Sequence, residues 1–381
     1  MKILTFTSLY PNKINPRHGV FVKNRMDYFD QIKGTSRKVI APTQYFPLLG
    51  LYPRSKFHTY HQVPAKEQQG NIPVYHPRYM TIPGLNLIDA AKAMARAADK
   101  IISKIYPDDE RFDLVDGHYL YPDGIAAYRL AKKYGKPLVL TARGSDVNFW
   151  MAQKKHLGPI LEAINYASKI FCVSQALKTR LIHYGVAEEK IMVLMNGVDK
   201  FFFNHGSNNT GDYLLSIGNL VPLKGQAYIL HALAALPDER LIIIGDGELG
   251  NSLKLLADEL GIANRVTFLP HVPQVELPHL YGHAKCTILM SSMEGMPNVI
   301  LESLAVGTPV IATNVGGISE VVTEDNGILL PHRNAEALIT ALNVALSHDW
   351  DRQQISENMK YLDWYETARK LHNCFSALIK T

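Results

Sequence analysis

Short apolar runs alternate with segments of helical periodicity along almost the whole chain. Strands and helices that alternate in this way form parallel sheets with helices on their faces, so the chain is predicted to be an α/β protein. The expected strands are 3–7, 38–41, 114–117, 137–141 and 169–173, and then 213–218, 241–245, 266–269, 286–290 and 309–312. The helices expected in the second half are 226–235, 249–260, 275–283, 297–306 and 335–347.

The length predicts two domains, because 381 residues exceed what one hydrophobic core usually supports. The polar, glycine-bearing segment 203–211 is the clearest linker in the sequence. Residues 42–86 contain many prolines and few helical signals, and we interpret them as a long irregular excursion. Excursions of that length within compact domains are usually functional or mobile.

The sequence favours a cytoplasmic protein. No apolar run is long enough to span a bilayer, and the first residues contain no small-residue cleavage site. Cys172, Cys286 and Cys374 are widely separated in apolar surroundings. We therefore predict reduced core thiols, with neither a disulfide framework nor a metal site.

Charge is distributed unevenly between the two halves. Residues 1–190 hold 28 Lys and Arg against 15 Asp and Glu, a net of +13, and the remaining residues hold 12 against 20, a net of −8. This asymmetry indicates an anionic partner for the first half. We favour an acidic membrane surface over nucleic acid, since the basic residues lack interleaved aromatics and no nucleic-acid-binding motif is present.

The most informative motif follows the expected strand 286–290 and contains Glu294, Pro297 and Glu302. It falls at the carboxyl edge of a sheet, where open α/β folds bind their ligands. Pro297 suits the first position of a helix, whose exposed amides of Asn298 and Val299 would form a seat for a phosphate. The two carboxylates would repel that phosphate, so we expect them to face hydroxyl groups. The alternative is an ordinary helix start with two solvated glutamates.

Lys224 follows the expected strand 213–218 at a strand-to-helix turn. A lysine at a helix start has an unfavourable sign for the helix dipole, so a role in neutralising a diphosphate is favoured over an ordinary surface position. A third motif, Gly245-Asp246-Gly247-Glu248-Leu249-Gly250, matches a dinucleotide-binding pattern. The acidic residue that this pattern requires about 20 residues later is absent, so we interpret the motif as a tight turn.

Together these motifs resemble glycosyltransferase family 4, and the resemblance covers nearly the whole chain. It rests on the Glu294–Glu302 pair, the turn from Gly218 to Gly225 and the Gly245–Gly247 turn. Further matching segments are 10–22, 118–124, 143–146, 173–174, 193–199 and 307–317. Those of the first half are similar to members that build bacterial surface polysaccharides.

The resemblance implies a GT-B fold, in which two Rossmann-like doubly wound domains face one another across a cleft. The acceptor domain would be residues 1–204 together with a C-terminal helix within 358–381, and the donor domain would be residues 205–357. The implied reaction is retaining transfer of a hexose-type sugar from a UDP- or GDP-sugar to a saccharide or polyprenol-linked acceptor. No metal or other cofactor is expected.

The resemblance also implies roles for individual residues. Glu294, Lys224 and His118 would be catalytic, with His118 contacting the donor sugar. Residues expected to bind the donor are Gly19, Asn219, Val272, Met296, Pro297, Asn298, Val299 and Glu302. Asn219 departs from the family, which usually has arginine there. Arg17 or Arg143 would compensate for the missing charge, and acceptor binding is assigned to Arg17, Arg143 and Asp146.

A basic stripe on the helix predicted near residues 88–104 suggests where a membrane would lie. Its members recur every four residues, and they are Lys92, Arg96, Lys100 and Lys104. The alternative is the solvated face of an ordinary helix. Two other functions stay open from sequence alone, namely an NAD-dependent oxidoreductase that uses Gly245–Gly250 and a noncatalytic sugar-binding relic of the fold.

Overall fold

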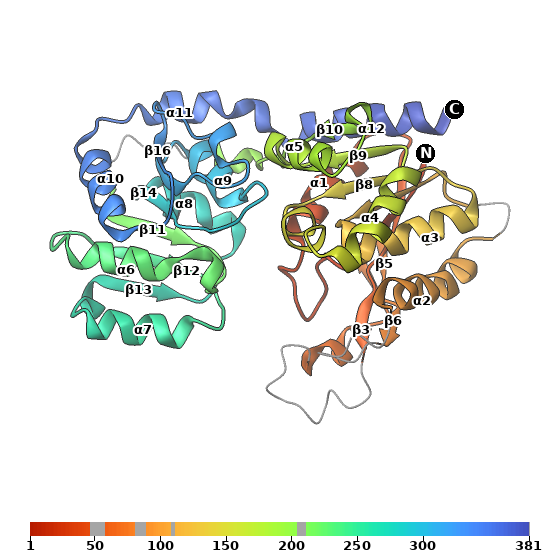
Figure 1. Cartoon of the computed structure of the whole chain (residues 1–381), viewed down its shortest axis with the longest axis horizontal. Helices are drawn as coiled ribbons and strands as arrows, with labels where there is room; N and C mark the ends of the chain where they lie inside the picture. Colours follow the sequence, from red (N-terminus) through yellow and green to blue (C-terminus); the bar gives the residue numbers. More distant parts are fainter. Residues whose placement is uncertain (46–57, 81–88, 108–110, 204–210, 381) are drawn as a thin grey trace. The chain divides into compact units, whose positions relative to one another are not determined.

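The computed structural model describes residues 1–45, 58–80, 89–107, 111–203 and 211–380 (Figure 1). The chain divides into two compact units, Met1–Met195 with Trp364–Thr381 (unit 1) and Asn196–Asp363 (unit 2). The predicted boundaries were residues 204 and 358. The actual ones differ because the Val198 amide donates to the Leu362 carbonyl at 2.7 Å, which fastens both ends of unit 2 together. Most of the expected linker 203–211 lies outside the described residues.

Unit 1 is built on a mostly parallel sheet with the strand order β10-β9-β8-β7-β1-β2-β5-β4. Only β4 runs antiparallel to its neighbour. The strand order reverses between β1 and β7, which makes the carboxyl ends of these two strands the topological switch point. The strands are β1 (Lys2–Phe6), β2 (Ser36–Ile40), β4 (Lys66–Gln69), β5 (Ile72–Tyr75), β7 (Leu114–His118), β8 (Leu138–Ala142), β9 (Lys169–Cys172) and β10 (Ile191–Val193).

Helices α1 (Val20–Asp30) and α12 (Trp364–Lys380) pack together and share one core with this sheet. The rings of Phe29 and Phe375 lie 5.4 Å apart, and Phe375 also contacts Phe171 of β9. The C-terminal helix therefore belongs to unit 1, beside α1 in Figure 1. Helix α3 (Ile125–Tyr134) packs against both α2 (Ala90–Ile105) and α4 (Lys154–Tyr166). Helix α5 (Gln175–His183) packs against β9 and β10.

The described part of residues 42–86 is more regular than predicted. Strands β4 and β5 form a hairpin whose turn, Gly70-Asn71, has Gly70 at φ +57°, a conformation that glycine adopts readily. A separate two-stranded sheet pairs β3 (Thr43–Tyr45) with β6 (Arg78–Met80), and a 3₁₀ turn, η2, covers His58–Gln62. The prediction of an irregular excursion was therefore wrong for these residues, because such short strands carry little period-two signal.

Unit 2 contains a fully parallel sheet with the order β13-β12-β11-β14-β15-β16. Its strands are β11 (Tyr213–Ile217), β12 (Leu241–Ile244), β13 (Val266–Leu269), β14 (Ala284–Leu289), β15 (Val310–Thr313) and β16 (Gly327–Leu330). The helices are α6 (Gln226–Ala234), α7 (Gly250–Glu259), α8 (Leu277–Gly282), α9 (Asn298–Val306), α10 (Ala335–Ser347) and α11 (Arg352–Asn358). The predicted α/β class with two doubly wound sheets is confirmed.

None of the helices among the described residues combines the length and the apolar character that crossing a bilayer requires. Cys172 and Cys286 are buried free thiols, whereas Cys374, predicted to be a core residue, is only half-buried.

Candidate functional site

The switch point of unit 2 lies between β11 and β14, where the strand order reverses. Ligands of doubly wound sheets bind at the carboxyl ends of the strands that flank such a point. The loop after β11 carries Lys224, and the loop after β14 carries Glu294. The two motifs identified in the sequence therefore occupy the position where this fold binds its ligand.

Lys224 and Glu294 form an ion pair at this position. The Lys224 Nζ lies 2.5 Å from Glu294 Oε1, and the Ser291 hydroxyl donates to the same oxygen at 2.6 Å. The two charged side chains are mostly buried, with 19% and 11% of their surface exposed. A charge pair that is largely shielded from water is strongly coupled, so a ligand that binds one partner also affects the other. No sequence motif indicates that Ser291 orients Glu294.

Backbone contacts hold the two loops in register. The Ser292 amide donates to the Leu223 carbonyl at 2.9 Å, which joins the Lys224 loop to the Glu294 loop. Gly225 has φ +70°, and a Cβ there would lie 2.2 Å from the Met290 carbonyl oxygen. Only glycine allows this approach, so the packing of the loops requires glycine at position 225.

The Gly245-Asp246-Gly247 turn supports the Lys224 loop from the other side. The Leu220 amide donates to the Asp246 carbonyl at 2.9 Å. A Cβ on Gly245 would lie 2.0 Å from the Gly218 oxygen, and one on Gly247 would lie 2.3 Å from the Leu220 oxygen. The two glycines are therefore required by close approach of the neighbouring backbone, which agrees with the interpretation as a tight turn.

Helix α9 starts one residue later than expected, with Pro297 as the N-cap residue. The amides of Asn298 and Val299 have no partner within the helix, as in any α-helix, and they carry the positive end of its dipole. The Asn196 side-chain amide donates to Asn298 Oδ1 at 2.7 Å, so Asn196 also belongs to this site. Met296 is buried with 6% of its surface exposed, so only its backbone is placed to meet a ligand.

Glu302 is enclosed rather than solvated. The Tyr281 hydroxyl donates to Glu302 Oε2 at 3.1 Å, and only 9% of Glu302 is exposed. Burial raises the pKa of its carboxyl to about 7, and the nearby Asp199 adds to this effect while the Tyr281 and Gln274 hydrogen bonds oppose it. Contact of Glu302 with a ribose stays a prediction. A ribose hydroxyl bound there would meet the Glu302 carboxyl, which gains and loses its proton near neutral pH.

We expect Glu302→Gln to stabilise unit 2 at about pH 8, by on the order of 1–3 kcal/mol, and to have little effect at about pH 4.5. The folded pKa of about 7 lies above the ordinary 4.5. The unfolded chain therefore releases this proton first, and the free energy of unfolding of the wild type falls as pH rises through that window. Urea unfolding at several pH values measures the difference. A gain from E302Q that is the same at every pH would contradict the assignment.

Two further residues expected to bind the donor lie on accessible loops of unit 2. Asn219 is exposed, and its carbonyl accepts a hydrogen bond from the Gln226 side chain at 3.1 Å. Val272 is half-buried in the loop that follows β13. Both lie beyond the carboxyl ends of strands, where the fold binds ligands. Their contacts with a nucleotide stay predictions.

His118 lies at the carboxyl end of β7 in unit 1 and is almost fully buried. Its Nε2 lies 3.0 Å from Asp116 Oδ2, and the Arg143 guanidinium donates to its Nδ1 at 2.8 Å. Burial lowers the pKa of His118 to about 4 against the opposing effect of Asp116, so the ring is neutral and carries its proton on Nε2. Both ring nitrogens are engaged. Contact with the donor sugar would require one of these bonds to open, and in this structure His118 orients Arg143.

Asp146 was predicted to bind the acceptor, and its structural position contradicts that role. The residue is fully buried, and its carboxylate accepts hydrogen bonds from the backbone amides of Leu120, Arg143, Gly144 and Val147 at 2.7–3.1 Å. A carboxylate that is saturated by four amides fixes the surrounding loops instead of contacting a ligand. Asp146 thus holds the loops that follow β7 and β8.

Gly19 and Arg17 precede α1 in the loop that follows β1. Gly19 has φ +69°, and a Cβ there would lie 2.1 Å from the Leu9 carbonyl oxygen, so the loop's own backbone requires glycine. Arg17 is exposed. It stays a hypothesis that Arg17 or Arg143 supplies the positive charge that is missing at Asn219, where the family usually has arginine. Contact of Gly19 with a diphosphate also stays a hypothesis.

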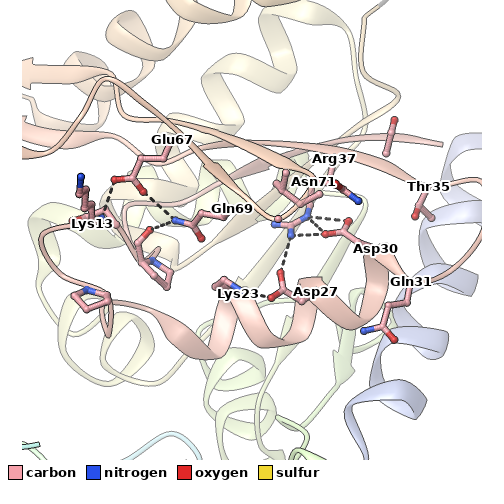
Figure 2. Close-up of a pocket in the computed structure, with 16 residues that line it drawn as sticks. Lys13, Lys23, Asp27, Asp30, Gln31, Thr35, Arg37, Glu67, Gln69 and Asn71 are labelled. Atoms are coloured by element: carbon pink, nitrogen blue, oxygen red, sulfur yellow. Dashed lines mark hydrogen bonds and ion pairs between the residues drawn. The ribbon is translucent and has the colours of Figure 1, made fainter. Parts of the chain in front are cut away.

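A large groove of about 920 Å³ in unit 1 runs between α1 and the β4–β5 hairpin (Figure 2). Its charged side chains are engaged with one another. The buried Arg37 guanidinium donates to Asp30 at 2.6–3.1 Å and to the Tyr10 hydroxyl at 3.2 Å, and Lys23 pairs with Asp27. We assign this network to the stability of unit 1, since its groups satisfy one another without a ligand.

Within the described ranges, no three His, Cys, Asp or Glu side chains come together in a way that could hold a metal ion.

Two doubly wound units with mostly parallel sheets, one of them with a lysine–glutamate pair at its switch point, have the fold of the GT-B class. Residues 54–200 match the family described as Glycosyltransferase Family 4, and residues 197–361, nearly all of unit 2, match the one described as Glycosyl transferases group 1. The two matches together span residues 54–361, so the chain is a glycosyltransferase that resembles family 4.

Relatives of known sequence and structure agree with this assignment. The chain is 26% identical, over the full length of both proteins, to the putative teichuronic acid biosynthesis glycosyltransferase TuaC of Bacillus subtilis. Among solved structures, sucrose-phosphate synthase of Thermosynechococcus elongatus has a TM-score of 0.79 and 17% identity, with 100% of this chain and 99% of that one covered. Anabaena HepE in complex with UDP has a TM-score of 0.70 and 19% identity, with 99% and 100% covered.

Proposed function

We propose that the chain is a retaining glycosyltransferase that moves a hexose-type sugar from a nucleoside diphosphate sugar to a saccharide or lipid-linked acceptor. The enzyme would take part in the synthesis of a cell-surface polysaccharide, and it would act at the cytoplasmic face of the membrane. The observation that carries the proposal is the Lys224–Glu294 pair beside the start of α9. TuaC, named for teichuronic acid biosynthesis, and HepE, solved with UDP and with UDP-glucose, support the donor and the pathway class.

Binding of the donor would exchange the partners of the ion pair. The diphosphate offers Lys224 more negative charge than one carboxylate does, and the amides at the start of α9 add hydrogen bonds to the phosphate. Glu294 would then be released to accept hydrogen bonds from hydroxyls of the donor sugar, while Ser291 keeps it oriented. Glu302 would accept a bond from the ribose. The pair thus holds both side chains in place before the ligand arrives.

In the transfer step, the bond between the anomeric carbon and the diphosphate oxygen breaks, and the leaving diphosphate takes the electron pair. The acceptor hydroxyl attacks the same face of the sugar, and its proton passes to an oxygen of the leaving phosphate. Lys224 and the α9 amides stabilise the charge that develops on the diphosphate. No carboxylate of this chain is assigned as a covalent nucleophile, and no metal takes part in the proposal.

Thermal unfolding with UDP, GDP or NAD, followed by NMR of the product's anomeric configuration, tests the proposed function. UDP or GDP is expected to raise the melting temperature, and NAD is not. The transferred sugar should keep its donor configuration, and EDTA should leave the rate unchanged. Stabilisation by NAD alone would exclude the donor assignment, inversion would exclude the retaining mechanism, and loss of activity in EDTA would exclude metal independence.

The basic stripe on α2 supports a second proposal, namely peripheral binding to an anionic membrane. Lys92, Arg96, Lys100 and Lys104 are all exposed, while Ala91, Met94, Ala98 and Ile102 on the other side of the helix are buried. A helix with one buried face and one basic face suits an acidic lipid surface.

Glutamine at all four basic positions of α2 is expected to weaken binding to vesicles containing phosphatidylglycerol by on the order of 10²-fold or more, since each basic residue contributes about 1 kcal/mol. Co-sedimentation measures the affinity, and vesicles of phosphatidylcholine alone give the neutral reference. Lys154→Gln with Lys155→Gln, at the start of α4, is the control for general loss of charge. Equal binding of the wild type to both kinds of vesicle would exclude this surface.

A further inference from the structure

A small cavity of about 210 Å³ lies in unit 1 where β1 and β2 end. Ser8 and Leu9 follow β1, and Thr43 and Gln44 belong to β3, directly after β2. The carboxyl edge of a parallel sheet is where α/β domains bind ligands, so the position is that of a substrate site. Asn12 lines both this cavity and the large groove described above.

The segment after β2 builds one wall of this cavity. Tyr60 and Val63 come from η2 and the residue that follows it, and Tyr79 comes from β6. The opposite wall is the loop from Asn12 to His18. The described residues 43–45 and 58–80, which include the separate β3–β6 sheet, therefore shape this space.

The residues that line the cavity carry hydroxyl, amide and phenol groups, and none of the described ones is lysine, arginine, aspartate or glutamate. Burial lowers the pKa of His18, so its ring is neutral at physiological pH. Amides and hydroxyls both donate and accept hydrogen bonds, as sugar hydroxyls do, and tyrosine rings offer apolar faces. A phosphate or carboxylate would find no cationic partner among these residues.

A buried carboxyl group behind the cavity also disfavours an anion. The Ser8 amide donates to Asp123 Oδ1, and Asp123 Oδ2 is buried and has no hydrogen-bond partner. Burial raises the pKa of Asp123 to about 7, so the group is partly ionised at neutral pH. Negative charge there would repel a second negative charge in the cavity.

We propose that this cavity receives the terminal sugar of a neutral saccharide acceptor, and that Tyr60, Val63 and Tyr79 in its wall determine which sugar fits. The inference rests on the proposed transferase function and names the chemistry of its acceptor. Since α2 packs against β6, which carries Tyr79, the proposed membrane-binding helix lies next to the element that contacts the acceptor.

The test uses the full chain with UDP-glucose and a panel of p-nitrophenyl glycosides of glucose, galactose, N-acetylglucosamine and glucuronic acid. The probes separate neutral acceptors from an anionic one. At least one neutral glycoside is expected to accept the sugar with a kcat/KM about tenfold or more above that of the glucuronide. The Val63→Phe variant, which fills the cavity, should abolish transfer while slow hydrolysis of UDP-glucose stays within about twofold of wild type.

Two milder variants keep the test decisive if V63F does not fold. Tyr79→Phe and Asn15→Leu should each raise the acceptor KM by roughly 5- to 20-fold through one lost hydrogen bond, with the donor KM unchanged. Asn71→Leu, in the large groove of Figure 2, is the matched control and should change neither value.

The outcomes separate this inference from the proposed function. Hydrolysis of UDP-glucose without transfer to any neutral glycoside, a preference for the glucuronide, or an unchanged acceptor KM in the cavity variants would overturn the inference and leave the transferase assignment in place. If the protein neither binds nor hydrolyses UDP-glucose or GDP-glucose, both the acceptor inference and the transferase assignment are overturned.

Discussion

Replacing Lys224 by methionine is expected to lower kcat/KM for sugar transfer by about 10²- to 10³-fold, because the leaving diphosphate loses the cation that is placed to neutralise it. The substitution keeps the length and the apolar stem of the side chain, but it removes the counter-charge of the mostly buried Glu294 carboxylate, so the melting temperature is expected to fall as well. Lys224 also pairs with Glu294 at 2.5 Å, and its loss leaves that carboxylate held by Ser291. Steady-state rates with UDP- and GDP-sugar donors measure the effect.

Lys254→Met is the matched control, since Lys254 is an exposed lysine on α7 of the same unit. Glu294→Gln tests whether the pair acts as a unit, and the double variant K224M/E294Q should lose less than the product of the two single losses. Turnover of K224M within about threefold of K254M would remove Lys224 from the mechanism.

Replacing Arg37 by methionine is expected to destabilise unit 1 by about 3–5 kcal/mol, the largest effect on stability that we anticipate for one side chain. The Arg37 side chain is fully buried and bonds to Asp30 through two nitrogens, to Asp27 and to the Tyr10 hydroxyl (Figure 2). Removing the cation leaves the Asp30 carboxylate, only 17% exposed, without its counter-charge. Thermal unfolding should show a fall of roughly 6–20 °C in the transition of unit 1.

Lys23→Met serves as the comparison, because Lys23 pairs with Asp27 while both side chains stay about one-third exposed. Loss of such an exposed pair should cost less than about 1 kcal/mol. If K23M and R37M have equal effects, the buried network is not what stabilises this part of unit 1.

The sequence predicted the two parallel sheets because their strands are continuous apolar runs, buried on both faces. Val266–Leu269 and helix Ala335–Ser347 have the predicted ends, and most other strands differ by one or two residues. The sequence could place Lys224 and Glu294 at one site because each follows a strand that flanks a switch point. Whether two strands flank a switch point depends only on the order of strands in the sheet.

The features that the sequence did not predict depend on contacts between segments that are distant in sequence. Asp146 belongs to a motif that looks functional, yet its four amide donors come from two loops that no local pattern connects. The neutral state of His118 likewise follows mainly from its burial, to which Arg143, 25 residues later, adds a smaller effect. The short strands β3 and β6 pair across 35 residues, so neither has the local periodicity that sequence patterns detect.

The position of α12 has a consequence for how the protein is made. Its Leu371 and Phe375 complete the core formed by Met26 and Phe29 of α1, although the whole of unit 2 is translated in between. While the ribosome synthesises unit 2, the earlier residues of unit 1 are already in solution with this apolar surface uncovered. We therefore expect that unit 2 can finish folding before the core of unit 1 is complete, because that core needs α12.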